Sequence, residues 1–383
     1  MRIRGFAFLG LASLATLALT LPASAGGVWT TGSIVVVQVG DGAAPLSSAA
    51  TPTFLKEFLP GTFTAGLSLS MPTAASGANR RFTNNGTATS EGFLKRSVDG
   101  NYLTLAGYDA AVGSTNPATT AGVPRVIARV DKNGTIDTTT GLTDTSFAGS
   151  NIRSVISTDG IDFWAAGTAS AGANGGVRCA TLGGSTSSQV SATVTNTRVV
   201  NIIDTGSGNQ LYVSTMSGAF RGVNTVGSGL SCAAGQTTTL LTGFDPSTSS
   251  PQSVYDYFFS DANTLYVADD RSLASGGGLQ KWTFSAGSWS LAYTISDSVG
   301  IAGLRGLTGV VGGGGTVTLY GTTSESSANR LVEIVDAGVG SPWVTRATAP
   351  TNTAFRGVDF SPEPATLALL GLGGLLFGRR RRT

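Results

Sequence analysis

Four arginines recur at equivalent places along this sequence, each at the start of a short β-branched stretch. They are Arg153 in RSVIS, Arg198 in RVVNI, Arg305 in RGLTG and Arg356 in RGVDF. A guanidinium group binds a carboxylate through two parallel N–H donors, and several such groups close together attract anions. If the fold gathers the four arginines, they predict an anion-binding funnel for an acidic glycan or a small anion. The alternative is structural, with the arginines bonding backbone carbonyls or stacking on Trp164 or Trp282.

The stretch NIIDTGSGNQLYV, residues 201–213, contains a second candidate site. Its Asp204-Thr205-Gly206 is similar to the active-site loop of pepsin-like aspartic proteases, in which two aspartates share one proton. The sequence has no second Asp-Thr-Gly or Asp-Ser-Gly. Asp and Gly are also favoured in hairpin turns, and Asp204 falls where the repeat described below places a turn. We therefore expect a turn and keep the protease as an alternative.

Histidine is absent from all 383 residues. This absence excludes Ser-His-Asp and Cys-His catalysis and histidine-ligated zinc. We predict no catalytic residue, no metal and no cofactor. A surface hydrolase or lyase that uses carboxylates in the funnel remains an alternative, because such an enzyme needs no histidine.

Five stretches of the chain share a pattern of strand, turn and second strand. They are residues 92–108, 153–168, 198–215, 252–269 and 305–322. The pattern recurs about every 50 residues, and each copy is followed by one or two further strand-like runs, which is typical of propeller blades. In this alignment Gln252 and Phe93 occupy the arginine position in the two copies that lack arginine. The arginines would then lie on the innermost strands, around a central channel.

A sixth half-copy, RGVDF at residues 356–360, closes the body. Two strand-like runs without a first half, GSIVVVQVG (32–40) and TPTFLKEFL (51–59), lie near the other end of the chain. Joining them would close the ring and remove exposed sheet edges. The sequence thus predicts an all-β, six-bladed β-propeller closed by strands from both chain ends, or a seven-bladed one if residues 60–92 contain further strands. A β-helix or a sandwich is the alternative.

The first 25 residues are typical of a cleavable secretory signal peptide. Arg2 and Arg4 precede an apolar core, and Ala23 and Ala25 form a small-x-small cleavage site before Gly26. Export makes a disulfide between the two cysteines, Cys179 and Cys232, the expected arrangement. Two separate thiols are the alternative.

The last 22 residues combine three unlike pieces. Pro362-Glu363-Pro364 precedes an apolar run at residues 365–378, which is followed by Arg379, Arg380, Arg381 and Arg382. As a helix the run would span roughly 21 Å, short of the ~30 Å hydrocarbon core of a bilayer. The order of these pieces resembles the PEP-CTERM sorting signal of Gram-negative bacteria. The resemblance implies processing by exosortase at Pro-Glu-Pro, transient anchoring by this transmembrane helix in the inner membrane, and association with exopolysaccharide and biofilm.

Three domains follow: a signal peptide (1–25), a body (26–361) and a sorting signal (362–383). Without the charged residues of the two end segments, the body has 18 basic and 21 acidic residues, which argues against nucleic-acid binding. We predict export by the Sec machinery and delivery to the cell surface, outer membrane or extracellular matrix. The leading function is non-catalytic binding of a glycan, such as an acidic exopolysaccharide, or of a protein.

Overall fold

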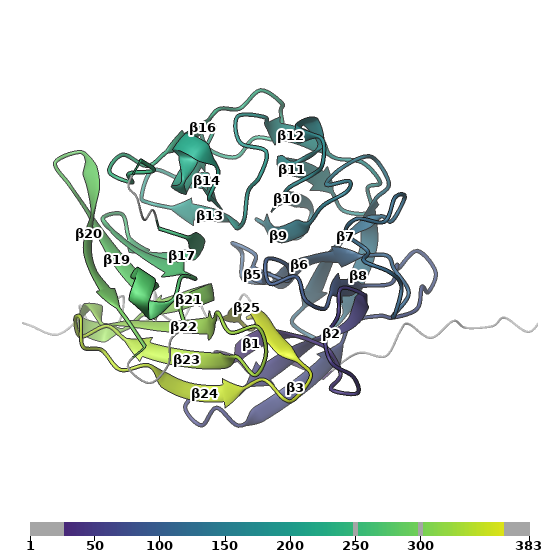
Figure 1. Ribbon diagram of the computed structural model, residues 1–383, viewed down its shortest axis with the longest axis horizontal. Coiled ribbons are helices and arrows are strands. Elements are labelled where there is room, and N and C mark those ends of the chain that lie inside the picture. The colour runs from purple at the N-terminus through teal and green to yellow at the C-terminus, as the bar shows by residue number, and fades with distance from the viewer. Residues whose placement is uncertain (1–26, 248–251, 298–301, 364–383) are drawn as a thin grey trace, which may run out of the picture.

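The computed structural model describes residues 27–247, 252–297 and 302–363, which form an all-β, propeller-like fold. Four sheets have four antiparallel strands each, and a fifth sheet has nine strands (Figure 1). The predicted signal peptide, Gly26 and the predicted segment from Pro364 to the arginines at 379–382 lie outside the described residues. Within the described part of the chain, no helix is long and apolar enough to cross a membrane.

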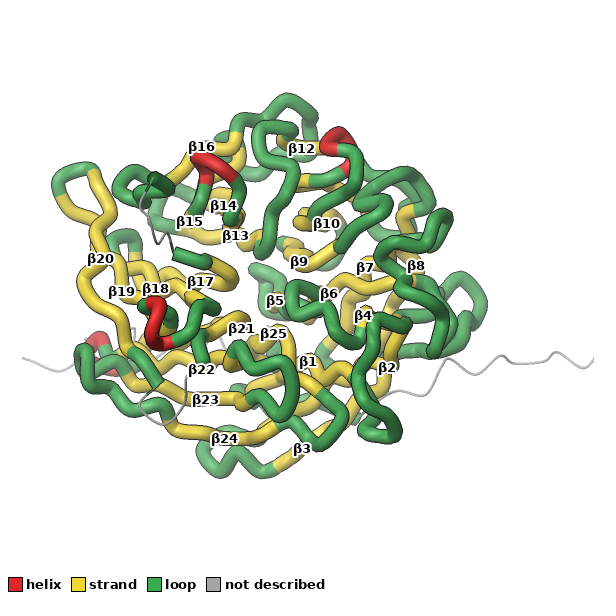
Figure 2. The backbone as a smooth tube through the Cα atoms, viewed as in Figure 1, coloured by secondary structure: helices red, strands yellow, loops and turns green. Residues whose placement is uncertain are grey.

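The four-stranded sheets follow one another along the chain. Their strands are β9 (Ile152–Ser157), β10 (Asp162–Gly167), β11 (Gly176–Thr181) and β12 (Ser188–Ser191); β13 (Val200–Asp204), β14 (Asn209–Thr215), β15 (Gly222–Val226) and β16 (Thr238–Leu240); β17 (Val254–Asp261), β18 (Thr264–Asp269), β19 (Gly278–Ser285) and β20 (Ser288–Ile295); and β21 (Leu304–Val311), β22 (Val317–Thr323), β23 (Arg330–Val335) and β24 (Val344–Thr348). Short 3₁₀ turns interrupt some of the connections (Figure 2). These are η1 (Gly172–Asn174), η2 (Gly218–Phe220), η3 (Leu273–Ser275) and η4 (Gly313–Gly315).

The nine-stranded sheet contains strands from both ends of the described chain. Its members are β1 (Ile34–Val39), β2 (Ala50–Phe58), β3 (Ala65–Ser70), β4 (Thr83–Asn85), β5 (Lys95–Arg96), β6 (Tyr102–Tyr108), β7 (Arg125–Asp131), β8 (Ile136–Leu142) and β25 (Ala354–Phe360). Two runs of four strands, β25-β1-β2-β3 and β5-β6-β7-β8, are joined through β4, which pairs with both β2 and β6. The strands β3 and β4 are the ones that residues 60–92 contain.

The predicted pairing of the two chain ends is confirmed. Strand β1 pairs antiparallel with β25, from Ile34 opposite Phe360 to Val39 opposite Ala354. All five predicted strand–turn–strand stretches also form antiparallel hairpins, from β5–β6 to β21–β22. Because β25, the last described strand, pairs with β1 in the first sheet, strands from both ends of the described chain close the ring.

Alternation of side chains explains why strands near the ring centre are apolar on both faces. In β1, with the sequence IVVVQV, every residue is buried. Val35, Val37 and Val39 enter the core shared with Leu55 and Leu103, whereas Ile34 and Val36 enter a separate core beside Leu331 and Phe355. Successive side chains of a strand point to opposite faces, so one strand supplies two cores between neighbouring sheets. This packing fixes the inner strands that carry the candidate site.

Candidate functional site

Six inner strands surround the centre of the ring in the order β25, β5, β9, β13, β17 and β21 (Figure 1). Three of the four predicted arginines lie in β-bulges of these strands. Arg153 is the extra residue between Ile152 and Ser154 of β9, and Arg305 is the extra residue between Leu304 and Gly306 of β21. Arg356 lies in the irregular part of β25, and Arg198 directly precedes β13. A bulge re-aims a side chain, and each of these three irregularities contains an arginine.

The four arginines gather around Tyr255 of β17. The guanidinium carbon of Arg198 lies 3.8 Å from the centre of the Tyr255 ring, and that of Arg305 lies 5.8 Å from it. Arg153 interacts electrostatically with Tyr255 and Arg198, and Arg356 interacts with Arg305 and Tyr255. Burial lowers the pKa of Arg153 and Arg198, and it lowers the pKa of Arg356 to about 10. We call Arg153, Arg198, Arg305 and Arg356 the arginine cluster.

Backbone carbonyls of neighbouring sheets accept hydrogen bonds from most of these guanidinium groups. Nη1 of Arg153 lies 2.7 Å from the Thr197 oxygen, Nη1 of Arg198 lies 2.8 Å from the Val254 oxygen, and Nη2 of Arg356 lies 2.9 Å from the Gly86 oxygen. These contacts match the structural alternative. The aromatic ring beside the arginines is that of Tyr255, however, and not that of Trp164 or Trp282. Trp164 donates a hydrogen bond to the Ser231 carbonyl, and Trp282 stacks on Phe244.

Acidic partners of the arginine cluster are few. Among the described residues, only Arg305 has a carboxylate within ion-pair distance, that of Asp270 at 3.2 Å. The Nε atoms of Arg153 and Arg356 are buried and have no hydrogen-bond partner in the described part of the chain. Donor groups and positive charge are therefore in excess at this end of the ring.

The buried carboxylate of Glu91 interacts electrostatically with the Arg356 guanidinium. It accepts hydrogen bonds from the Tyr108 hydroxyl at 2.7 Å, the Asn85 amide at 3.0 Å and the Asn151 side chain. Burial raises the pKa of Glu91, and the hydrogen bonds and Arg356 oppose this effect. With a fully enclosed carboxyl group, Glu91 offers no oxygen to an incoming ligand.

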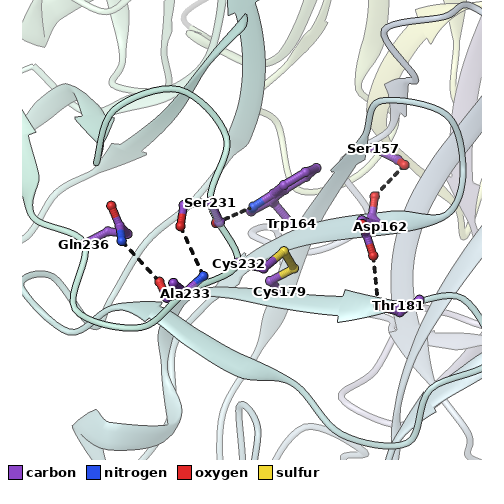
Figure 3. Close-up of a disulfide and its surroundings, with 9 residues drawn as sticks. All are labelled: Ser157, Asp162, Trp164, Cys179, Thr181, Ser231, Cys232, Ala233 and Gln236. Carbon is purple, nitrogen blue, oxygen red and sulfur yellow. Dashed lines mark hydrogen bonds between the residues drawn. A yellow bond between two sulfur atoms is a disulfide. The ribbon is translucent and has the colours of Figure 1, made fainter.

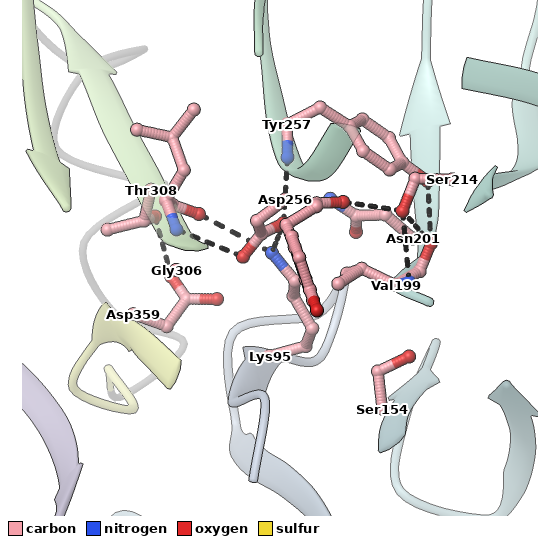
Figure 4. A network of polar contacts seen from close by, with 12 residues as sticks. Lys95, Ser154, Val199, Asn201, Ser214, Asp256, Tyr257, Gly306, Thr308 and Asp359 are labelled. Carbon is pink, nitrogen blue, oxygen red and sulfur yellow. Dashed lines mark hydrogen bonds and ion pairs between the residues drawn. The ribbon is translucent and has the colours of Figure 1, made fainter. Parts of the chain in front are cut away.

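A buried ion pair fills the ring centre beside the cluster (Figure 4). Nζ of Lys95, on β5, lies 2.5 Å from Oδ1 of Asp256, on β17, and these two inner strands face each other across the ring. Lys95 is 3% exposed and Asp256 is fully buried. Phe93 and Tyr255 stack across the same gap, with ring centres 5.7 Å apart. Sequence reasoning missed this pair, although the aspartate in VYDYFF is a single charged residue among apolar and aromatic ones.

Asp256 and Asp359 make the same kind of contact with the next inner strand. Asp256 accepts the Leu307 amide, and Asp359 accepts the Arg96 amide. The residues predicted at the arginine position in the other two copies, Gln252 and Phe93, lie just before β17 and β5, and β17 has a bulge between Val254 and Tyr257.

Asp204 is the exposed last residue of β13, directly before the turn to β14. Its Oδ1 accepts the amides of Gly206 at 2.8 Å and Gly208 at 3.1 Å. These contacts are those of a turn residue. No group of three or more Asp, Glu or Cys that could hold a metal occurs among the described residues.

Cys179 and Cys232 form a disulfide between neighbouring sheets (Figure 3). Cys179 belongs to β11, and Cys232 lies in the connection from β15 to β16. Their Cα atoms are 5.3 Å apart, and beside them Nε1 of Trp164 donates to the Ser231 carbonyl at 2.9 Å. The bond thus joins two neighbouring sheets outside the inner strands β9 and β13.

Towards the C-terminus of the sequence, residues 362–382 match the family model described as the PEP-CTERM protein-sorting motif. The chain carries a PEP-CTERM sorting motif. The motif implies processing by exosortase, and proteins that bear it are exported and sorted to the surface in Gram-negative bacteria. Of the motif, the described residues include Pro362 and Glu363.

No curated protein matches the chain. Solved structures similar to it include a putative oxidoreductase (glucose dehydrogenase) from Thermus thermophilus, at 15% identity over 76% of this chain and 94% of that one, with a TM-score of 0.40. A protein from Lactobacillus plantarum shares 13% identity over 83% of each chain, with a TM-score of 0.44. A hypothetical selenium-binding protein from Sulfolobus tokodaii shares 10% identity over 88% of this chain and 95% of that one, with a TM-score of 0.44. No activity is transferred from these distant similarities.

Proposed function

We propose that this PEP-CTERM protein is a non-catalytic, surface-sorted binding protein whose arginine cluster takes anionic groups of a glycan or protein partner. The observation that carries the proposal is the gathering of four guanidinium groups around Tyr255 with a single ion-paired carboxylate, Asp270. Guanidinium groups bind carboxylates strongly when they are partly desolvated. A uronate-rich exopolysaccharide supplies repeated carboxylates, so it is the preferred ligand class.

The ring in this proposal has six blades. The two four-stranded runs of the nine-stranded sheet, β25-β1-β2-β3 and β5-β6-β7-β8, count as two blades beside the four separate sheets. Each blade then has one of the six inner strands, which supports six blades rather than seven.

Strand direction supports binding at the arginine cluster while the tail is held elsewhere. The arginines stand at the beginnings of inner strands, whereas Ser361 to Glu363 follow the end of β25. Because the inner strands run in the same sense, Pro362 and Glu363 lie at the end of the ring opposite the cluster. Attachment of the tail to a membrane would leave the cluster free to meet a ligand.

The alternative, a hydrolase or lyase, has less support from the contacts. Such an enzyme needs carboxyl groups within reach of a substrate. Asp256 is paired with Lys95, Asp359 accepts the Arg96 amide and the Thr308 hydroxyl, and Glu91 is buried against Tyr108. Among the described carboxylates at the ring centre, these three are engaged in structural bonds.

Binding of the purified mature protein to uronate-rich and to neutral glycans tests the proposal. We expect binding to the uronate-rich glycan only, weakening with salt because ionic strength screens exposed charges. The variant Arg153→Ala/Arg305→Ala should lose at least tenfold in affinity. The matched control is Arg81→Ala/Arg221→Ala, which removes two arginines that do not belong to the cluster and should retain the affinity. Equal binding by both double variants would refute the site.

A further inference from the structure

The sorting motif begins almost at the last strand of the ring. Strand β25 ends at Phe360, and only Ser361 separates it from Pro362. Asp359, the penultimate residue of β25, accepts the Arg96 amide of β5 at 2.8 Å. A motif with so short a connection stays against the body unless contacts near the end of β25 open.

Contacts from two parts of the body hold the residues at the start of the motif. The Ser361 amide donates to the Ser33 carbonyl at 2.9 Å, and its hydroxyl donates to the Thr30 carbonyl at 2.8 Å. Ser361 is fully buried, and Pro362 is buried beside it. The segment before β1, with Thr30 and Ser33, therefore forms one side of a contact surface for Ser361 and Pro362, which we call the seat.

The hairpin β5–β6 forms the other side of the seat. The Glu363 amide donates to the Gly100 carbonyl at 2.9 Å, and the Glu363 carboxylate lies 3.4 Å from Nη1 of Arg96. The same nitrogen lies 3.4 Å from the Ser361 carbonyl, and the Arg96 guanidinium carbon lies 5.8 Å from the centre of the Phe360 ring. Arg96 thus contacts the chain on both sides of Pro362.

We propose that this seat, formed by Thr30, Ser33, Arg96 and Gly100, is a docking site for the Pro-Glu segment of the sorting motif, and that the folded body competes with exosortase for it. Docking occupies both the backbone amide and the carboxylate of Glu363, the central residue of Pro-Glu-Pro. Processing then requires that the motif undocks, or that exosortase reaches the motif before the ring has closed. The competition rests on the proposed processing at Pro-Glu-Pro, whereas the docking rests on the contacts alone.

The rate of processing of the full-length chain in cells that contain exosortase tests the competition. An exposed ion pair contributes modestly, so we expect Arg96→Ala to raise the rate about two- to fivefold. Arg81→Ala, which removes a similarly exposed arginine that pairs with Asp109, is the matched control and should leave the rate unchanged. A second variant with a six-residue Gly-Ser insertion between Ser361 and Pro362 leaves the motif sequence intact and should be processed at least as fast as Arg96→Ala.

Amide hydrogen exchange of the unprocessed chain measures docking without exosortase. We expect slow exchange at Ser361 and Glu363, and faster exchange at Glu363 in Arg96→Ala. Unprotected Glu363 in the wild-type chain would overturn the docking site. Protected Glu363 with equal processing rates in the wild type and both variants would overturn the competition. If even the insertion variant is not processed, the assignment of processing fails, and the competition with it.

Discussion

Lys95 and Asp256 meet across the centre of the ring, with Nζ of the lysine 2.5 Å from Oδ1 of the aspartate (Figure 4). They come from β5 and β17, two inner strands on opposite sides, and are 161 residues apart in the sequence. Asp256 also accepts the amides of Tyr257 at 2.8 Å and Leu307 at 3.1 Å. This one carboxylate therefore connects three inner strands.

Removal of either partner of this pair should destabilise the ring strongly. Lys95→Met leaves the Asp256 carboxylate buried without its cation, and Asp256→Asn leaves the Lys95 ammonium without its anion. Each should lower the free energy of unfolding by about 3–5 kcal/mol, and the double variant should cost less than the sum of the two. Chemical unfolding measures these effects. The control Arg81→Met breaks a more exposed pair and should cost less than about 1 kcal/mol, so equal losses in Lys95→Met and Arg81→Met would contradict the prediction.

Close approach of two inner strands makes Gly357 of β25 intolerant of a side chain. A Cβ atom at this position would overlap the amide nitrogen of Leu94 and lie 2.7 Å from the Gly92 oxygen. Gly357→Ala must push β25 and β5 apart, and we expect a loss on the order of 2–4 kcal/mol. Gly313→Ala, at a site where nothing lies within 4 Å of such an atom, is the control for thermal unfolding. A stable Gly357→Ala protein would show that the strands can separate there.

Because of Asp336, the free energy of unfolding should depend on pH in the acidic range. Burial acts to raise the pKa of Asp336, but hydrogen bonds from Lys281, Tyr266 and Tyr293 outweigh this effect and lower it to about 2. The folded-state pKa lies below the unfolded value of about 3.9. The stabilisation is therefore complete above about pH 4 and disappears as the pH falls towards 2.

Comparison of Asp336→Asn with the wild type over pH 2–6 checks this dependence. At pH 6 the variant should be less stable by roughly 1–3 kcal/mol, as expected for hydrogen bonds to a charged group. The difference should shrink between pH 4 and pH 2. A difference that stays constant over this range would assign the effect to packing rather than to the charge of Asp336.

Reduction of the Cys179–Cys232 disulfide should lower the melting temperature. The bond joins residues 53 positions apart, and the chain-entropy model assigns it about 4 kcal/mol. A reducing agent should destabilise the wild type to the level of Cys179→Ser/Cys232→Ser and leave that double variant unaffected. If the wild type does not respond although mass analysis shows reduced thiols, the bond contributes nothing to stability.

Much of the architecture could be predicted from local patterns. The five hairpins and the runs that became β1 and β2 are visible because alternation, turn residues and the repeat are properties of neighbouring residues. Arg153, Arg198, Arg305 and Arg356 could be aligned for the same reason. The bulge in β17 between Val254 and Tyr257 could not be predicted, because no pattern of neighbouring residues marks it.

The sequence by itself determined the all-β repeat, the sorting motif, the two cysteines available for a disulfide and the equivalence of the four arginines. Only the tertiary structure decided that Tyr255 is the common neighbour of those arginines, that Lys95 pairs with Asp256, and that Arg96 holds Glu363. The two ion pairs join residues far apart in the chain, and closure of the ring sets which inner strands face or adjoin each other. No local pattern carries that information, because a charged side chain takes the partner that the packed backbone brings within reach.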